Sequence, residues 1–255
     1  VPVQAGMTPG GVAGYGLEMI RNVDVLVLGA GAAGMMAAIE AGRRGRSVLV
    51  VDHARAPGEK IRISGGGRCN FTNVNTRPDR FISRNHKFAV SALKRYTPER
   101  FIALVRAYGI AFHEKALGQL FCDGPSVQVV NLLTAEMGKA GVTLELATTI
   151  EAVERADAGF RVRLSSGEVS ATSLVIATGG KSIPRMGATG LGYRLAEQFG
   201  LAVTETRPAL VPLTFEPRML ERLAPLSGIS TDAIVTANGR SFREALLFTH
   251  RGLSG

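Results

Sequence analysis

The sequence VDVLVLGAGAAG at residues 23–34 decides the fold. Its first half, up to Leu28, is an apolar run typical of a buried parallel strand, and a helical pattern follows the glycines. The second half has the spacing G-x-G-x-x-G. In such a turn Gly29 permits the sharp bend, Gly31 lets a pyrophosphate approach the backbone, and Gly34 allows helix and strand to touch. The stretch therefore predicts a dinucleotide site.

A second apolar strand, predicted at residues 47–51, ends at Asp52 and completes a βαβ unit of the size expected for a right-handed crossover. The helix start would offer free N–H groups of Ala32 and Ala33 to the phosphates. Asp52, with His53 beside it, would accept hydrogen bonds from the adenosine ribose; the alternative is a cap or turn acid. This unit alone does not separate FAD from NAD.

Two later glycine-rich segments favour FAD: SGGGRCNFTN at residues 64–73 and VIATGG at residues 175–180. Each could be an ordinary turn, but their order after the first motif favours a backbone that wraps a flavin dinucleotide. The predicted cofactor contacts in and near them are Lys60, Ser64, Gly65, Gly66, Gly67, Arg68, Cys69, Asn70, Thr72, Asn73, Thr178, Gly179 and Gly180.

These motifs carry a family resemblance. The sequence resembles the bacterial NAD(P)/FAD-dependent oxidoreductases labelled aminoacetone-oxidase-like flavoproteins, which are similar to bile-acid enone reductases and to a flavin-dependent ribosomal RNA dihydrouridine synthase. The resemblance covers nearly everything after Asn22. The matching stretches are residues 58–73, 177–180, 187–193, 208–213 and 246–255.

The resemblance implies an α/β chain: a Rossmann-like FAD-binding domain with a β-meander, followed by the start of an inserted β-rich domain. We expect a leader at residues 1–21, the FAD-binding domain at 22–205, and an incomplete β-rich substrate domain at 206–255. In this family a C-terminal return segment closes over the flavin, and we expect the chain to end before it. An Asn238-Gly239 turn predicts a hairpin in the last part.

The leading hypothesis for function is an FAD-dependent oxidoreductase. Hydride would pass from transiently bound NAD(P)H through FAD to an electron-poor double bond of a small molecule. A second hypothesis makes uridine in RNA the acceptor. A third is a flavin-binding fragment without catalysis.

No side chain is assigned a catalytic role, although Arg68 and Cys69 are candidates. A cation at Arg68 or Lys60 could stabilise the reduced flavin, and the alternative is a surface cation. The thiol of Cys69 could lie near the flavin, but small buried thiols often only pack.

Composition limits the remaining choices. The two cysteines form no CxxC pair and the four histidines have no metal-ligand spacing, so we expect no metal and a reducing cytoplasmic location. We also expect no membrane crossing. The sequence leaves the oligomeric state open.

The net charge of +9 is concentrated between Arg77 and Arg106, where eight basic residues face only Asp79 and Glu99. RNA could bind this run, which is interleaved with aromatic residues. The alternative is an ordinary solvated helical face.

Overall fold

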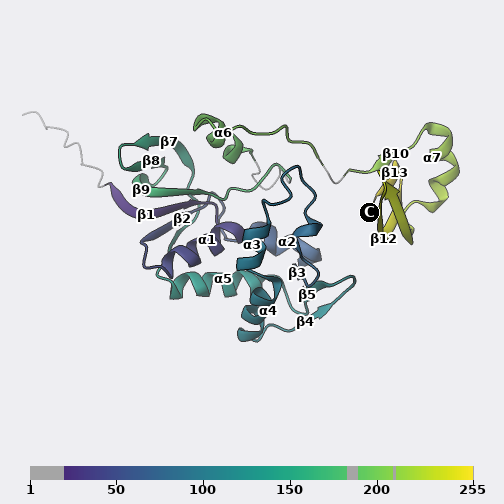
Figure 1. Ribbon diagram of the computed structural model, residues 1–255, viewed down its shortest axis with the longest axis horizontal. Helices are drawn as coiled ribbons and strands as arrows, with labels where there is room; N and C mark the ends of the chain where they lie inside the picture. The colour runs from purple at the N-terminus through teal and green to yellow at the C-terminus, as the bar shows by residue number, and fades with distance from the viewer. Residues whose placement is uncertain (1–19, 183–188, 209–210, 255) are drawn as a thin grey trace, which may run out of the picture. The chain divides into compact units, whose positions relative to one another are not determined.

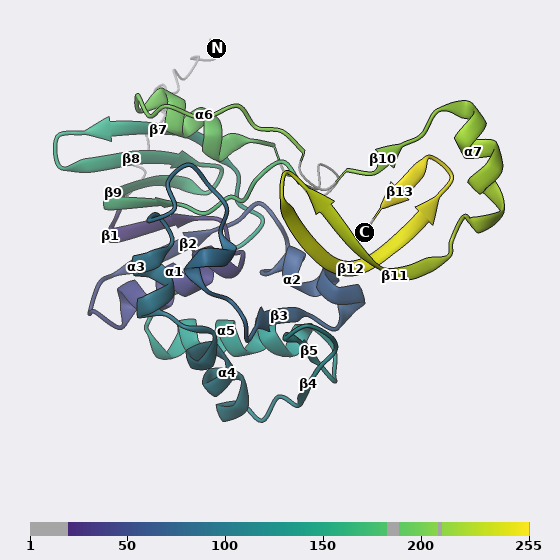
Figure 2. The same cartoon turned by 45° about the vertical axis from the view of Figure 1, so that its right-hand side comes forward.

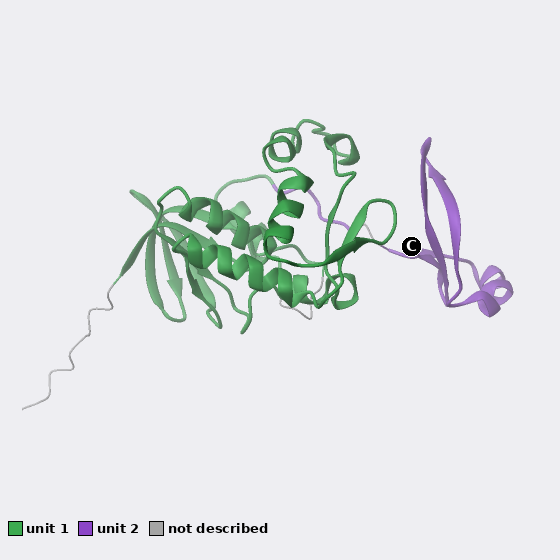
Figure 3. Ribbon diagram, turned by 90° about the horizontal axis from the view of Figure 1, so that it is seen from below, with its two compact units in different colours: residues 1–202 green, residues 203–255 purple. Residues whose placement is uncertain are grey.

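The computed structural model describes residues 20–182, 189–208 and 211–254, which fall into two compact units (Figures 1 and 3). Unit 1 is Val1–Ala202 and unit 2 is Val203–Gly255, so the division lies close to the predicted boundary after residue 205.

The predicted leader lies outside the described residues except for Ile20 and Arg21, and Arg21 already begins a strand. Parts of three family-like segments, residues 187–188, 209–210 and 255, also lie outside them.

Unit 1 is built on a six-stranded sheet with the order β6-β2-β1-β9-β8-β7. Its parallel strands are β1 (Arg21–Leu28), β2 (Val48–Val51), β6 (Thr143–Glu145) and β9 (Gly167–Ile176). The meander adds β7 (Ile150–Ala156) and β8 (Gly159–Leu164), which are antiparallel. The meander is therefore part of the main sheet. Its third strand is β9, which is ten residues long. β9 pairs with β8 over its first half and with β1 up to Ile176, at the start of the glycine-rich segment at residues 175–180.

Both faces of the central strand are buried, which explains why β1 reads as a continuous apolar run. Val27 packs into one core cluster with α1 (Ala32–Gly42) and α5 (Val127–Lys139). Leu26 and Leu28 point the other way, into a cluster with the meander and α6 (Leu191–Gln198). Figure 2 shows α1 and α5 on one side of the sheet and α6 on the other.

The family-like stretch at residues 58–73, which includes the glycine-rich segment at 64–73, is largely regular secondary structure. It contains α2 (Glu59–Ile63), the 3₁₀ turn η1 (Ser64–Gly67) and β3 (Asn70–Asn73). β3 belongs to a small sheet, order β3-β5-β4, with β5 (Gln119–Cys122) and β4 (Phe112–Glu114). Left-handed φ angles of 56° at Gly65 and 64° at Gly66 turn the helix end into the strand.

The basic run is divided among several short elements. These are η2 (Pro78–Arg80), α3 (Val90–Arg95) and α4 (Pro98–Ala107). Residues 81–88 between them are exposed and belong to no helix or strand. The run is therefore helical in α3 and α4, and the stretch between η2 and α3 lies outside the helices.

Unit 2 is a four-stranded antiparallel sheet with the order β10-β13-β12-β11. Its strands are β10 (Leu213–Thr214), β11 (Ser230–Ala237), β12 (Arg240–Thr249) and β13 (Gly252–Ser254), with α7 (Pro217–Leu223) and the 3₁₀ turn η4 (Ala224–Leu226) between β10 and β11. The predicted hairpin is present, with φ of 49° at Asn238 and 74° at Gly239, as a two-residue turn requires.

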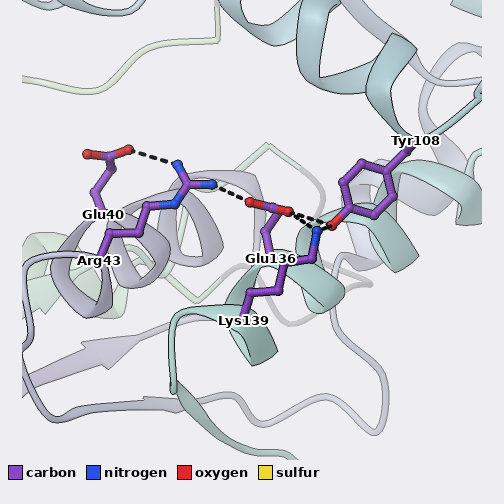
Figure 4. Close-up of polar contacts among 5 residues, drawn as sticks. All are labelled: Glu40, Arg43, Tyr108, Glu136 and Lys139. Atoms are coloured by element: carbon purple, nitrogen blue, oxygen red, sulfur yellow. Dashed lines mark hydrogen bonds and ion pairs between the residues drawn. The ribbon is translucent and has the colours of Figure 1, made fainter.

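A buried carboxylate ties three helices of unit 1 together (Figure 4). The side chain of Glu136, on α5, is 7% exposed. It accepts hydrogen bonds from Tyr108, at the end of α4 (2.5 Å), from Lys139 (2.9 Å) and from Arg43, at the end of α1. Hydrogen bonds from Tyr108 and then Lys139 outweigh burial and hold the pKa of Glu136 below its ordinary value of 4.5.

Replacing Glu136 with Gln should lower the free energy of unfolding by about 1–3 kcal/mol at neutral pH, because hydrogen bonds to a charged group are lost. Since the folded state depresses this pKa, the stabilisation is present above pH 4.5 and is lost as pH falls through the folded value. Urea unfolding at several pH values should therefore show the difference from wild type shrinking in acid. Glu40→Gln, at a half-exposed partner of Arg43, should change stability by no more than about 0.5 kcal/mol. Equal effects of the two variants would contradict this account.

Candidate functional site

The glycine turn has the geometry that its spacing predicts. A Cβ added at Gly34 would lie 1.8 Å from the carbonyl oxygen of Gly29, so only glycine lets α1 start this close to the strand. A Cβ at Gly29 would lie 2.5 Å from the Ala177 carbonyl oxygen, and the φ of 109° at Gly29 also favours glycine. At Gly31, by contrast, no heavy atom of the described residues lies within 4 Å of the added Cβ. Gly29 and Gly34 thus serve packing, and Gly31 faces open space.

The start of α1 is suited to a phosphate. The first intrahelical bond runs from Met35 N–H to the Gly31 carbonyl, so the amides of Ala32, Ala33 and Gly34 precede the helical ladder. Ala32 and Ala33 are exposed. The residue before the helix is glycine and the first turn contains no acid. Free N–H groups and the positive end of the helix dipole therefore meet at an open surface.

Asp52 positions this turn. One carboxylate oxygen accepts the N–H of Ala30 (2.6 Å) and the other accepts the N–H of Ala54 (2.9 Å). The Nδ1 atom of His53 lies 3.2 Å from the second oxygen. Each carboxylate oxygen can accept a further bond, so the predicted ribose contact is compatible with this positioning role.

A cavity of about 940 Å³ opens from the turn, at the upper end of the range for small-molecule sites. It lies at the carboxyl ends of β1, β2 and β9 and beside Thr148, which follows β6. In open α/β sheets this is where ligands bind. Apolar and aromatic side chains form much of the wall: Met36, Ile61, Phe71, Leu93, Tyr96, Phe101, Val129 and Leu133.

The cavity brings together most of the predicted cofactor contacts. Those that line it are Gly29, Gly31, Ala32, Ala33, Asp52, His53, Lys60, Ser64, Cys69, Asn70, Thr72, Thr178 and Gly179. The structure does not place Gly34, Gly65, Gly66, Gly67, Arg68, Asn73 or Gly180 in the lining. Gly34 is taken up by the strand contact, and the three consecutive glycines form the turn between α2 and β3.

Of the two candidate cations, Lys60 lines the cavity and Arg68 does not. Lys60 Nζ donates to the Ser182 hydroxyl at 2.9 Å, and it lies 3.5 Å from where a Cβ on Gly179 would be. The Arg68 guanidinium donates instead to the carbonyl of Asp123. It would have to leave that carbonyl to reach a bound cofactor.

The two cysteines are free and buried. Burial raises the pKa of Cys69, so its sulfur stays a neutral thiol at physiological pH. Burial, together with the charges of Cys69 and Asp123, raises the pKa of Cys122 to about 11. Cys69 lines the cavity and has a left-handed φ of 51°, but its thiol lacks the lowered pKa of a nucleophile.

Several lining residues were not predicted. Tyr96 and Phe101 lie in the basic run, where the sequence indicated RNA binding or a solvated face and no cofactor contact. Thr148 and Thr149 precede the meander, and Ile150 is the first residue of β7. Arg194 of α6 adds a second cation, and its guanidinium donates to the carbonyl of Thr189 (2.8 Å). The stretch GATGLGY at residues 187–193 could have indicated this wall, since it matches the family there.

Comparison with known proteins identifies the family. The HI0933-like protein Rossmann domain matches residues 23–249. The chain belongs to this family. It is a family of FAD-binding oxidoreductases, so the predicted resemblance and the Rossmann-like fold class are confirmed.

Three curated relatives are similar over most of this chain. A ribosomal RNA dihydrouridine synthase from Escherichia coli is 50% identical over 92% of this chain and 59% of its own length. A ribosomal RNA dihydrouridine synthase from Haemophilus influenzae is 45% identical over 93% of this chain and 60% of its own length. A 3-dehydro-bile acid delta(4,6)-reductase from Clostridium scindens is 28% identical over 83% of this chain and 51% of its own length. The chain thus spans less than two thirds of each relative.

Among the described residues, none of the helices combines the length and apolar character needed to cross a membrane.

Gly31→Val should abolish flavin binding while leaving the fold intact. The added side chain meets open space in the protein and blocks the approach of a pyrophosphate. The absorption spectrum of the purified variant should lack bound flavin, with thermal unfolding close to wild type.

Gly138→Ala, on the exposed face of α5, is a matched control that also meets open space and should keep its flavin. A yellow Gly31→Val protein with unchanged stoichiometry would refute the pyrophosphate assignment.

Proposed function

We propose that the protein is an FAD-dependent reductase that passes hydride from NAD(P)H to an electron-poor carbon–carbon double bond. The observation that carries this proposal is the open helix start at Ala32 and Ala33, which leads directly into a cavity with aromatic and aliphatic walls. Together they fit a dinucleotide whose phosphates need N–H donors and whose ring system needs an apolar slot.

The residues of the chain have distinct tasks in this proposal. The start of α1 would hold the pyrophosphate, and Asp52 keeps the turn in place through Ala30. Phe71 and Phe101, with ring centroids 6.0 Å apart, help to exclude water from the wall of the cavity. Bound FAD would supply the two-electron chemistry, taking a hydride from one substrate and giving it to the next. Lys60 would stabilise negative charge on the reduced cofactor.

The donor would be NAD(P)H, bound transiently. The sequence contains a single G-x-G-x-x-G, so a nicotinamide dinucleotide would not have its own Rossmann turn in this chain. The balance is simple: NAD(P)H loses two electrons as hydride, and the acceptor gains that hydride and a proton from solvent.

RNA is the acceptor that a specific observation favours. The segment at residues 77–92 leaves the cavity wall after Thr76 and returns to it at Leu93. It carries Arg77, Arg80, Arg84 and Lys87, together with Phe81 (48% exposed) and Phe88 (82% exposed). Exposed aromatics among cations are typical of surfaces that bind single-stranded nucleic acid. The two relatives named as ribosomal RNA dihydrouridine synthases support uracil as the acceptor.

The proposal places the protein in the cytoplasm, where ribosomal RNA is found and reducing conditions keep thiols free.

Anaerobic addition of NADH or NADPH to the flavin-loaded chain tests the proposal. The flavin absorbance should bleach, and uridine-containing ribosomal RNA should restore it with formation of dihydrouridine. Absence of bleaching with either nucleotide would favour a flavin-binding fragment without catalysis. Bleaching followed by reoxidation with a small enone, but not with RNA, would favour a small-molecule acceptor.

Lys60→Met should slow the bleaching step by about tenfold or more, because a charge that stabilises the reduced cofactor is removed. Rapid-mixing absorbance measures this rate. Lys87→Met removes an equal charge from the exposed segment outside the cavity and should leave the rate unchanged. Equal rates in both variants and wild type would exclude the assigned role of Lys60.

Replacing both Phe81 and Phe88 with Ala should weaken binding of single-stranded RNA by about tenfold or more, since each base stacked on an aromatic ring contributes roughly 1–3 kcal/mol. Flavin content should not change. Phe242→Ala, at a half-exposed phenylalanine of β12, serves as the control. RNA affinity that survives the double replacement would show that these rings make no stacking contacts.

A further inference from the structure

A second hollow, of about 600 Å³, lies on unit 1 between the outer side of α1 and the α3–α4 region. Its charged lining comes from Glu40, Arg43 and Arg44 on one side and from Arg95 and Arg100 on the other. The four guanidinium groups outnumber the one carboxylate, so the hollow attracts anions.

The arginines on the two sides differ in their partners. Arg43 and Arg44 pair with Glu40 at 3.5 and 3.2 Å, and Arg43 also contacts Glu136. Arg95 and Arg100 are exposed and form no ion pair with any residue that the structure describes. These two guanidinium groups are therefore available to an outside ligand. Arginine is the side chain best suited to bidentate contacts with phosphate.

The hollow shares a wall with the flavin-site cavity. Met36 and Tyr96 line both spaces. Burial raises the pKa of the Tyr96 hydroxyl, which also senses the charges of Arg43, Glu40 and Arg100. Tyr96 therefore reaches from the cavity toward the arginines. A ligand with a flat ring in the cavity and a phosphate nearby could occupy both spaces.

We propose that Arg95 and Arg100 bind a backbone phosphate of the RNA whose uracil enters the cavity, an inference that rests on the function proposed above. The segment at residues 77–92, which precedes Arg95 in the chain, carries further exposed cations, and this favours an extended polyanion. Phosphate contacts of this kind set the register of a nucleic acid without reading its bases. The hollow would thus position the uridine, and the cavity would carry out its reduction.

The test measures the affinity of the flavin-loaded chain for a short uridine-containing single-stranded RNA at several salt concentrations. Arg95→Gln combined with Arg100→Gln should weaken binding about tenfold or more. The plot of log affinity against log salt should become shallower by about 0.7 for each phosphate that the variant no longer neutralises. Flavin content and thermal unfolding should stay at wild-type values, because both side chains are exposed.

Two further variants sharpen the test. Arg218→Gln combined with Arg222→Gln removes the same charge from exposed positions of α7 and should leave the salt dependence unchanged. Glu40→Gln removes the carboxylate of the hollow and frees Arg44, so it should tighten RNA binding. The arginine variant should lower RNA affinity and the Glu40 variant should raise it. Such opposite changes in affinity are expected only if an anion binds in this hollow.

Two results would overturn the assignment, and a third would separate it from the proposed function. Unchanged RNA affinity in the Arg95/Arg100 variant would remove the phosphate site while leaving the proposed reduction of uridine intact. A raised KM for NADPH, but not for NADH, with unchanged RNA affinity would assign the hollow to the 2′-phosphate of the donor. Salt-dependent RNA binding that needs both arginines, without formation of dihydrouridine, would keep the site and refute the proposed function.

Discussion

The close approach of α1 to β1 is the constraint on which the rest of unit 1 depends. The Gly34 backbone sits against the Gly29 carbonyl, where any Cβ would collide, and Gly29 itself touches the end of β9. This contact brings the helix start to the carboxyl edge of the sheet with its amides exposed. It also lets Met35 and Ile39 pack beneath the strands beside α5. The proposed phosphate site and the core thus depend on the same turn.

The cavity depends on elements that are distant in the sequence. Asp52, at the end of β2, fixes the glycine turn, while α2 brings Lys60 toward Gly179 after β9. The apolar wall comes from α3, α4, α5 and the small sheet. The helices are themselves joined through Glu136, so the packing that carries Tyr96 and Phe101 is tied to the packing of α1. The contacts of Glu136 that stabilise the fold therefore also help to fix the geometry of the cavity.

Sequence reasoning predicted the turn, both flanking strands, the meander and the Asn238-Gly239 hairpin, because each has a local pattern with a local physical cause. It indicated, within the family-like stretch at residues 58–73, a glycine-rich backbone that wraps the cofactor. The structure shows a short helix, a turn and a strand there, since β3 is stabilised by pairing with β5, almost fifty residues later. It also treated Arg68 and Lys60 as equivalent cations. Only the carbonyl of Asp123, supplied by another part of the chain, distinguishes them.

The sequence by itself determined the glycine turn and the open helix start that we propose as a phosphate site, because glycine spacing, strand and helix lie within one short stretch and their geometry follows from steric limits on the backbone. The tertiary structure alone decided which side chains wall the cavity. It also decided that Tyr96 separates that cavity from an arginine-lined hollow. The physical reason is that such walls form where elements far apart in the chain pack together. A local pattern of apolar residues indicates that one face of a helix is buried, but it does not indicate which element that face contacts.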